Sequence, residues 1–129
     1  MTTPQDLRYS PSHEWIRDEG DGTATVGITH HAQDKLGDVV FWEGPKAGAK
    51  VAKGRSLGVV ESVKATSDVY APVSGEVIAN NDALSDDPSK VNADPYGAGW
   101  MVRLRISDPS ELAALLDAAA YAAHVAKVD

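Results

Sequence analysis

The chain of 129 residues contains no cysteine. Disulfide bonds, cysteine-based zinc ribbons and thiol nucleophiles are therefore excluded, and any redox chemistry must be carried by an attached group. No segment approaches the roughly 18 consecutive apolar residues that a membrane-spanning helix needs. The amino-terminal stretch "MTTPQDLRYSPSHEW" has neither a charged region followed by an apolar run nor an Arg-rich amphipathic pattern. We therefore expect a cytoplasmic protein of bacterial type, or a mitochondrial-matrix protein whose leader was removed, with no membrane partner.

Basic residues are also scarce relative to acidic ones. There are 12 Lys and Arg residues against 19 Asp and Glu residues, which gives a formal charge of −7. A surface of this sign repels a phosphate backbone, so nucleic acid is a poor candidate partner. The charge suits a protein that docks on other proteins, and plain solubility, common among mildly acidic domains, is the simpler reading.

The length and the hydrophobic content of 43% predict one domain over residues 1–129. The predicted secondary structure is mainly β, with a hairpin around "DEGDG", β-rich runs between residues 44 and 80, and a late strand in "WMVRLRI". Thr29 and Gly37 are suited to begin and end a short helix. Residues 81–99 are rich in turn formers and predict a long loop with one or two helical turns.

The last segment has the pattern of an amphipathic helix over about residues 109–123. Asp108 can cap it, Pro109 suits the first helical position, and Glu111 would complete a capping box. Leucine and alanine residues then recur at the spacing of one buried helical face. A helix of this kind is expected to pack on a sheet.

A single amine, Lys64, lies between two β-rich runs in "GVVESVKATSDVYAPVSGEV". The runs "SLGVVES" and "SDVYA" are of similar length, so the lysine is predicted to protrude from the tip of a tight hairpin. Glu61 and Asp68 flank this tip and could serve as anionic handles for an enzyme that must select one lysine. A lysine side chain can form an amide at the end of a long flexible stem. A surface lysine without a special role is the alternative reading of Lys64 taken alone.

At this point the sequence resembles the glycine cleavage H-protein family. The similarity rests on "ESVKATSDVYAPVSGEV" together with "HEW", "TATVGIT", "LGDVVF" and "NADPYGAGW", in order over roughly residues 7–121. It implies a lipoyl carrier whose lipoate is attached to Lys64. It also implies a barrel-sandwich hybrid of two antiparallel sheets, with the lysine on a hairpin and a helix at the C-terminus. Trp42 and Gly44 in "VVFWEGP" and the alanine-rich tail depart from the family's usual pattern, away from the lysine.

The resemblance further implies a shuttle that catalyses no step itself. Glycine decarboxylase (P protein) would load the aminomethyl group on the lipoyl arm, aminomethyltransferase (T protein) would take the one-carbon unit, and dihydrolipoamide dehydrogenase (L protein) would reoxidise the dithiol. A lipoyl ligase or a lipoyl/octanoyl transferase would first modify Lys64. Glu61, Ser62 and Val63 are the residues expected to be recognised for that attachment. We expect a monomer, because the carrier must leave its surface free for successive partners.

The loaded arm bears an ammonium group that is prone to be lost in water, so it should rest in a cleft that limits water access. An anion should receive this ammonium there, because burying an unpaired charge is costly. The candidates for this cleft are Glu14, Asp68 and His31, which align with the family's region for the loaded arm. We expect no metal site: His30 and His31 are adjacent on a predicted helix and point about 100° apart, which makes them poor joint ligands.

Four other classes are alternatives to this carrier. Biotinyl domains have a similar hairpin, but they typically place methionine on both sides of the lysine, where this chain has Val63 and Ala65. Lipoyl domains of 2-oxoacid dehydrogenases usually have aspartate before the lysine and a mobile linker to a catalytic domain. A lipoyl donor or relay protein, and a plain β interaction module with an unmodified lysine, are the remaining alternatives.

Overall fold

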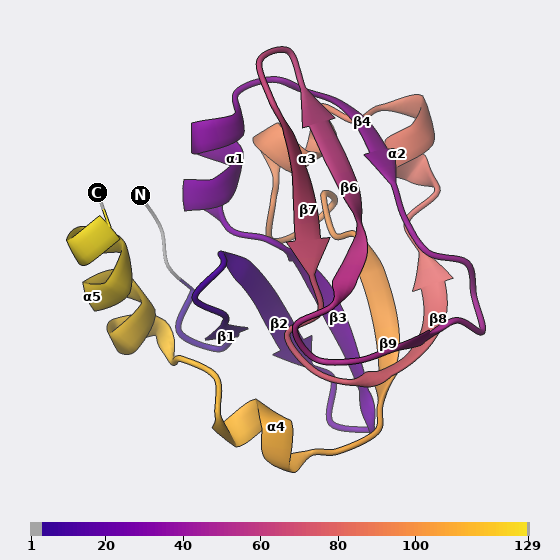
Figure 1. The fold of residues 1–129 in the computed structure, drawn as a ribbon, viewed down its shortest axis with the longest axis vertical. Helices are drawn as coiled ribbons and strands as arrows, with labels where there is room; N and C mark the ends of the chain where they lie inside the picture. Colours follow the sequence, from indigo (N-terminus) through magenta and orange to yellow (C-terminus); the bar gives the residue numbers. More distant parts are fainter. Residues whose placement is uncertain (1–3, 129) are drawn as a thin grey trace.

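The computed structural model describes residues 4–128 and shows a mainly β protein (Figure 1). The strands are β1 Arg8–Tyr9, β2 Glu14–Asp18, β3 Thr23–Ile28, β4 Val39–Glu43, β5 Lys50–Val51, β6 Ser56–Ser62, β7 Thr66–Tyr70, β8 Gly75–Asn80 and β9 Val102–Ile106. The helices are α1 His30–Leu36, α2 Ala83–Asp86, α3 Lys90–Ala93, α4 Ser110–Ala113 and α5 Ala118–Val128. Among these described helices, none is long and apolar enough to cross a membrane.

The strands form two antiparallel sheets, as predicted. The larger sheet has the order β1-β2-β3-β9-β8-β5, and the smaller has the order β4-β6-β7. Inward-facing residues of both sheets, among them Val26, Val60 and Leu104, pack into one apolar core. The β6–β7 hairpin extends beyond this core at one end of the molecule, with α1 beside it (Figure 1). The expected barrel-sandwich architecture with short helices and a C-terminal helix is confirmed.

Helix α1 begins and ends at the predicted residues for the predicted reasons. Thr29 is its N-cap, and the Thr29 hydroxyl oxygen accepts a hydrogen bond from the Ala32 amide at 3.2 Å. Gly37 ends the helix with φ of 79°, a left-handed conformation that glycine adopts without the steric cost of a Cβ atom. Local side-chain chemistry therefore sets both ends of this helix.

A second apolar cluster holds the C-terminal helix against the N-terminal strands. Tyr121 of α5 stacks on Tyr9 of β1, with ring centroids 4.6 Å apart, and Trp15 and Ala118 pack in the same cluster. Trp15 and Trp42 are both buried, in the second and the first cluster respectively. Helix α5 therefore packs against β1, the edge strand of the larger sheet, through aromatic contacts.

The prediction of one continuous helix over residues 109–123 is wrong, because the segment forms two helices separated by residues 114–117. The Leu116 amide donates to the Tyr9 carbonyl and the Tyr9 amide donates to the Leu116 carbonyl, both at 2.8 Å. This bridge to β1 holds Leu116 in an extended conformation, so helical propensity is overridden by tertiary hydrogen bonds. The chain then turns again at Asp117, whose carboxylate accepts from the Ala120 amide at 2.8 Å.

The expected capping box at the start of α4 is not formed. The Glu111 carboxylate instead accepts hydrogen bonds from the amide and the hydroxyl of Ser74, at 2.7 and 3.2 Å. The Asp108 carboxylate does accept from the Ser110 amide at 3.1 Å, as its capping position suggested. Glu111 therefore ties α4 to the larger sheet rather than to its own helix.

Candidate functional site

The turn that presents Lys64 is held by its own backbone and one serine. The Ser62 amide donates to the Ala65 carbonyl at 2.8 Å, and the Ser62 hydroxyl oxygen accepts from the amides of Ala65 and Lys64 at 3.1 and 3.4 Å. The Val63 amide donates to the Asp38 carbonyl at 3.0 Å, which ties the tip to the segment before β4. Hydrogen bonds among residues 62–65 therefore shape the turn, and one bond to Asp38 anchors it to the segment before β4.

The side chains around the tip are open to solvent. Lys64 is exposed, and the Val63 side chain is 69% exposed. Glu61 is also exposed and pairs across the strands with Phe41 and Thr66. The tip thus offers an amine, an apolar side chain and a carboxylate to an approaching enzyme.

Gly37 leaves room for the lysine stem beside α1. A Cβ atom built on Gly37 would lie 3.4 Å from Cε and 3.9 Å from Nζ of Lys64. The Gly37 carbonyl accepts a hydrogen bond from the Asn92 side-chain amide at 2.8 Å, so this surface is held in place. The Lys64 side chain therefore lies close to the end of α1.

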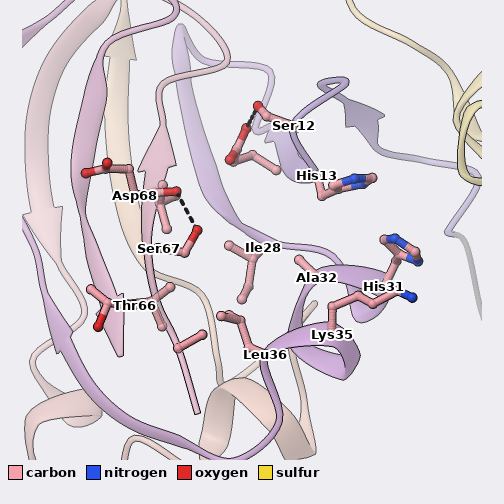
Figure 2. Close-up of a pocket in the computed structure, with 14 residues that line it drawn as sticks. Ser12, His13, Ile28, His31, Ala32, Lys35, Leu36, Thr66, Ser67 and Asp68 are labelled. Carbon is pink, nitrogen blue, oxygen red and sulfur yellow. Dashed lines mark hydrogen bonds between the residues drawn. The ribbon is translucent and has the colours of Figure 1, made fainter. Parts of the chain in front are cut away.

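A cavity of about 360 Å³ runs along the hairpin between β7 and α1, from Ala65 beside the tip to Val69 near the foot. It is lined by Ser12, His13, Glu14, Ile28, His31, Ala32, Lys35, Leu36, Val60, Ala65, Thr66, Ser67, Asp68 and Val69. Figure 2 shows Ser67 and Asp68 on one side, His13 and His31 on the other, and Ile28 and Leu36 between them. The three residues predicted for the cleft, Glu14, His31 and Asp68, all line this one cavity although they come from β2, α1 and β7.

Glu14 is a buried carboxylate with fixed oxygens. Its side chain is 2% exposed. Oε1 accepts from the hydroxyls of Ser10 and Ser12, the first at 2.5 Å, and Oε2 accepts from the Tyr70 amide at 3.2 Å. Burial raises the pKa of Glu14 above its usual range, although these hydrogen bonds act in the opposite direction. The wall therefore carries a preoriented carboxylate, and a negative charge on it is costly to bury.

Asp68 and His31 contribute differently to the wall. Asp68 is exposed on the hairpin side, where its carboxylate accepts from the Ser56 hydroxyl at 3.1 Å. His31 is buried on α1, and its ring centroid lies 4.6 Å from that of His13. Asp68 therefore supplies charge at the rim, whereas His31 belongs to an imidazole pair on the opposite side.

Several cavity residues were not identified from the sequence. His13 precedes Glu14 in "SHEW" and has a left-handed φ of 76°, unusual for a residue with a Cβ atom. Lys35 lies four residues after His31, a spacing that places both on one face of α1 and could have identified it. No spacing pattern in the sequence indicates that the Ser10 and Ser12 hydroxyls hydrogen-bond Glu14. Within residues 4–128, no group of three or more His, Asp or Glu side chains is arranged to hold a metal ion.

Comparisons with known proteins agree on one family. The sequence model of the glycine cleavage H-protein family matches residues 7–128. The chain is 59% identical over 118 residues to the glycine cleavage system H protein of Laribacter hongkongensis, covering 92% of this chain and 93% of the relative. It is 59% identical over 120 residues to the Escherichia coli protein of the same name, covering 93% of each.

A solved structure is similar over nearly the whole fold. The crystal structure of a glycine cleavage system H protein from Mycobacterium marinum matches with a TM-score of 0.87 and 41% identity, covering 95% of this chain and 98% of that one. Sequence and fold therefore point to the same family as the hairpin lysine and its neighbouring cavity. The chain belongs to the glycine cleavage H-protein family, and it is a lipoyl carrier protein of the glycine cleavage system rather than an enzyme.

Proposed function

We propose that Lys64 is the residue to which lipoate is attached, through an amide on Nζ. Its exposed position at the tip of a two-stranded hairpin lets a ligase or transferase enclose the amine while the rest of the fold stays outside. The attached group would supply a disulfide that is reduced as it takes up the aminomethyl group on one sulfur, and that is re-formed when the dithiol left after transfer gives its electrons to the dehydrogenase. The turn around Ser62 presents the amine in a fixed direction, which supports this assignment.

Glu61, Ser62 and Val63 are proposed to act in recognition during attachment. Ser62 acts through the shape of the turn, because its hydroxyl is hydrogen-bonded within it. Val63 and Glu61 act directly, since both side chains are exposed beside the amine. An apolar contact and a charge contact on either side of the lysine would distinguish it from the other exposed lysines of the chain.

The cavity at the foot of the hairpin is proposed to receive the loaded arm. The observation that carries this proposal is the buried carboxylate of Glu14 on the wall of a partly apolar cavity next to the hairpin. An ammonium group placed there would offset the unfavourable burial of the Glu14 charge and would be shielded from water. Asp68 at the rim would attract the ammonium, and His31 would line the opposite wall.

The enzymes proposed to dock on the exposed hairpin are the P, T and L proteins of the glycine cleavage system. Each must reach the end of the arm, so the arm has to leave the cavity during docking. The proposed location is the bacterial cytoplasm or the mitochondrial matrix, where these enzymes would share one compartment with the carrier. Neither membrane nor nucleic acid is proposed as a partner.

The attachment site is tested by the mass of the peptide that contains residue 64. Protein isolated from its native host should show a lipoyl adduct on Lys64. A Lys64→Arg variant should show none, whereas Lys50→Arg, a change of an exposed lysine on β5, should keep the adduct. Glycine–carbon dioxide exchange with glycine decarboxylase then separates a glycine carrier from a lipoyl relay. An adduct on another lysine would contradict the proposal.

A further inference from the structure

Tyr121 of helix α5 contacts the cavity wall from behind without lining the cavity. Its side chain is 2% exposed, and its ring stacks on Tyr9. The Tyr121 hydroxyl oxygen lies 2.7 Å from the Thr29 hydroxyl and 2.8 Å from Nδ1 of His13. One hydroxyl therefore joins two segments that are separate in the sequence.

The first of these segments leads to α1. Thr29 is the N-cap of this helix, and its hydroxyl accepts from the Ala32 amide. Helix α1 supplies four of the cavity-lining side chains, namely His31, Ala32, Lys35 and Leu36. An N-cap whose hydroxyl is held from outside restricts the movement of the whole short helix, because a helix of two turns has few internal hydrogen bonds to stabilise it alone.

The second segment leads to Glu14. His13 adjoins Glu14, lines the cavity itself and stacks obliquely against His31. Its left-handed backbone, at φ of 76°, is unfavourable for a residue with a Cβ atom and needs surrounding contacts to persist. The contact from the Tyr121 hydroxyl to Nδ1 also bears on which ring nitrogen of His13 carries the proton.

We infer that Tyr121 is a positioning residue that holds the two sides of the cavity, α1 and the His13–Glu14 segment, at a fixed separation. The inference rests on the proposed function insofar as the cavity receives the loaded arm. Helix α5 thereby becomes a support for the arm's resting site, although it contributes no lining side chain. Removal of the hydroxyl would let the two walls separate and admit water to the carried group.

The test uses Tyr121→Phe, which keeps the stacking on Tyr9 and removes only the hydroxyl. Tyr9→Phe is the matched control, because the Tyr9 hydroxyl donates to the Pro4 carbonyl at 2.6 Å, outside α1 and the His13–Glu14 segment. Tyr96→Phe is a second comparison, since the Tyr96 hydroxyl accepts from the His30 amide at 3.0 Å and so contacts the start of α1.

The first readouts use the unmodified protein. In Tyr121→Phe, amide exchange at Ala32 and Gln33 should rise about 5- to 10-fold relative to Val77 in β8, as expected for loss of one buried hydrogen bond. Nitrogen NMR of the His13 ring should show an altered tautomer distribution. Tyr96→Phe should raise the exchange at α1 but leave the His13 ring signals unchanged, and Tyr9→Phe should change neither.

The last readout uses lipoylated, glycine-loaded protein, from which ammonia should be released several-fold faster in Tyr121→Phe than in Tyr9→Phe. Unchanged α1 exchange and unchanged His13 signals in Tyr121→Phe would overturn the inference. A uniform rise of exchange across the chain would also overturn it, because it would indicate a general structural role. If the wild-type protein failed to retain a carried group, the proposed function would fail, while the NMR readouts would still decide the role of Tyr121.

Discussion

At the tip of the β6–β7 hairpin, Lys64 is exposed and presented mainly by hydrogen bonds among residues 62–65, with one further bond from the Val63 amide to the Asp38 carbonyl. At the foot of the same hairpin, Glu14 is buried and held by groups from the segments around residues 10–12 and 70. Substitutions at the tip should therefore have little effect on the fold. At the foot, the position of the Glu14 carboxylate depends on tertiary packing, so a substitution there affects both. A carrier requires both, because the amine must enter other proteins and the loaded arm must be withdrawn from water.

The largest effect is expected for Lys64→Arg at the tip. An arginine cannot form the lipoyl amide, so transfer of the aminomethyl group should be abolished. Because the side chain is exposed, the free energy of unfolding should change by less than about 0.5 kcal/mol. Coupled glycine oxidation and urea denaturation measure the two quantities. Residual transfer by the arginine variant would contradict the assignment.

At the foot, Glu14→Gln should weaken retention of the loaded arm. The amide keeps the size of the side chain but removes its charge, and a lost charged hydrogen bond is worth about 1.5–3 kcal/mol, or about 10- to 160-fold in the escape of the carried group. The rate of ammonia release from loaded protein measures this loss. Lipoate attachment should be unaffected, and an attachment defect equal to the retention defect would show that tip and foot are not separate.

Glu61→Ala should slow lipoate attachment several-fold and leave the free energy of unfolding within about 0.5 kcal/mol of wild type, since the side chain is exposed. Glu43→Ala is the matched control, because Glu43 is an exposed carboxylate on the neighbouring strand, opposite Val59. Attachment kinetics with a purified ligase measure the difference. Equal rates for the two variants would refute a specific role of Glu61.

The smallest effect concerns pH and Glu14. Burial raises the pKa of Glu14 in the folded protein, so the folded state binds its proton more tightly than the unfolded state does. Glu14 therefore lowers the free energy of unfolding as pH rises from the usual carboxyl range through the raised pKa. As pH falls across this window, the free energy of unfolding of the wild type should therefore rise relative to that of Glu14→Gln. A difference that does not vary with pH would contradict the raised pKa.

The same titration should affect retention in the opposite direction. Protonation of Glu14 removes the anion proposed to receive the ammonium, so release of the carried group should accelerate as pH falls far enough to protonate Glu14; the bound ammonium lowers the pKa of this carboxyl relative to that in the empty cavity. Glu14→Gln should lack this dependence. Measuring ammonia release over the same pH range checks whether one group governs both properties of the foot.

Local features of the molecule were predictable from the sequence. The two strands flanking Lys64 follow from β-rich runs of matched length, and both ends of α1 follow from Thr29 and Gly37. In each case the deciding interactions lie within a few residues. The C-terminal helix was predicted as continuous because its apolar spacing is helical, but the bridge between Leu116 and Tyr9 divides it. Glu111 likewise bonds Ser74 instead of its own helix.

The proximity of Glu14, His31 and Asp68 was expected only from the family resemblance, since no spacing rule relates positions so far apart. Their roles toward the loaded arm remain predictions. His13 and the two serines that hydrogen-bond Glu14 could not be predicted from the sequence. An isolated polar residue near a strand does not indicate which side chain it will contact in the folded protein.

By itself, the sequence determined that an amine would protrude from a β-hairpin of a cysteine-free, acidic protein, because strand alternation and turn chemistry act between near neighbours. Only the tertiary structure decided that a buried carboxylate, two imidazoles and a tyrosine hydroxyl would converge beneath that hairpin. Their convergence depends on how two sheets and a distant helix pack, and packing is a property of the whole chain rather than of any segment.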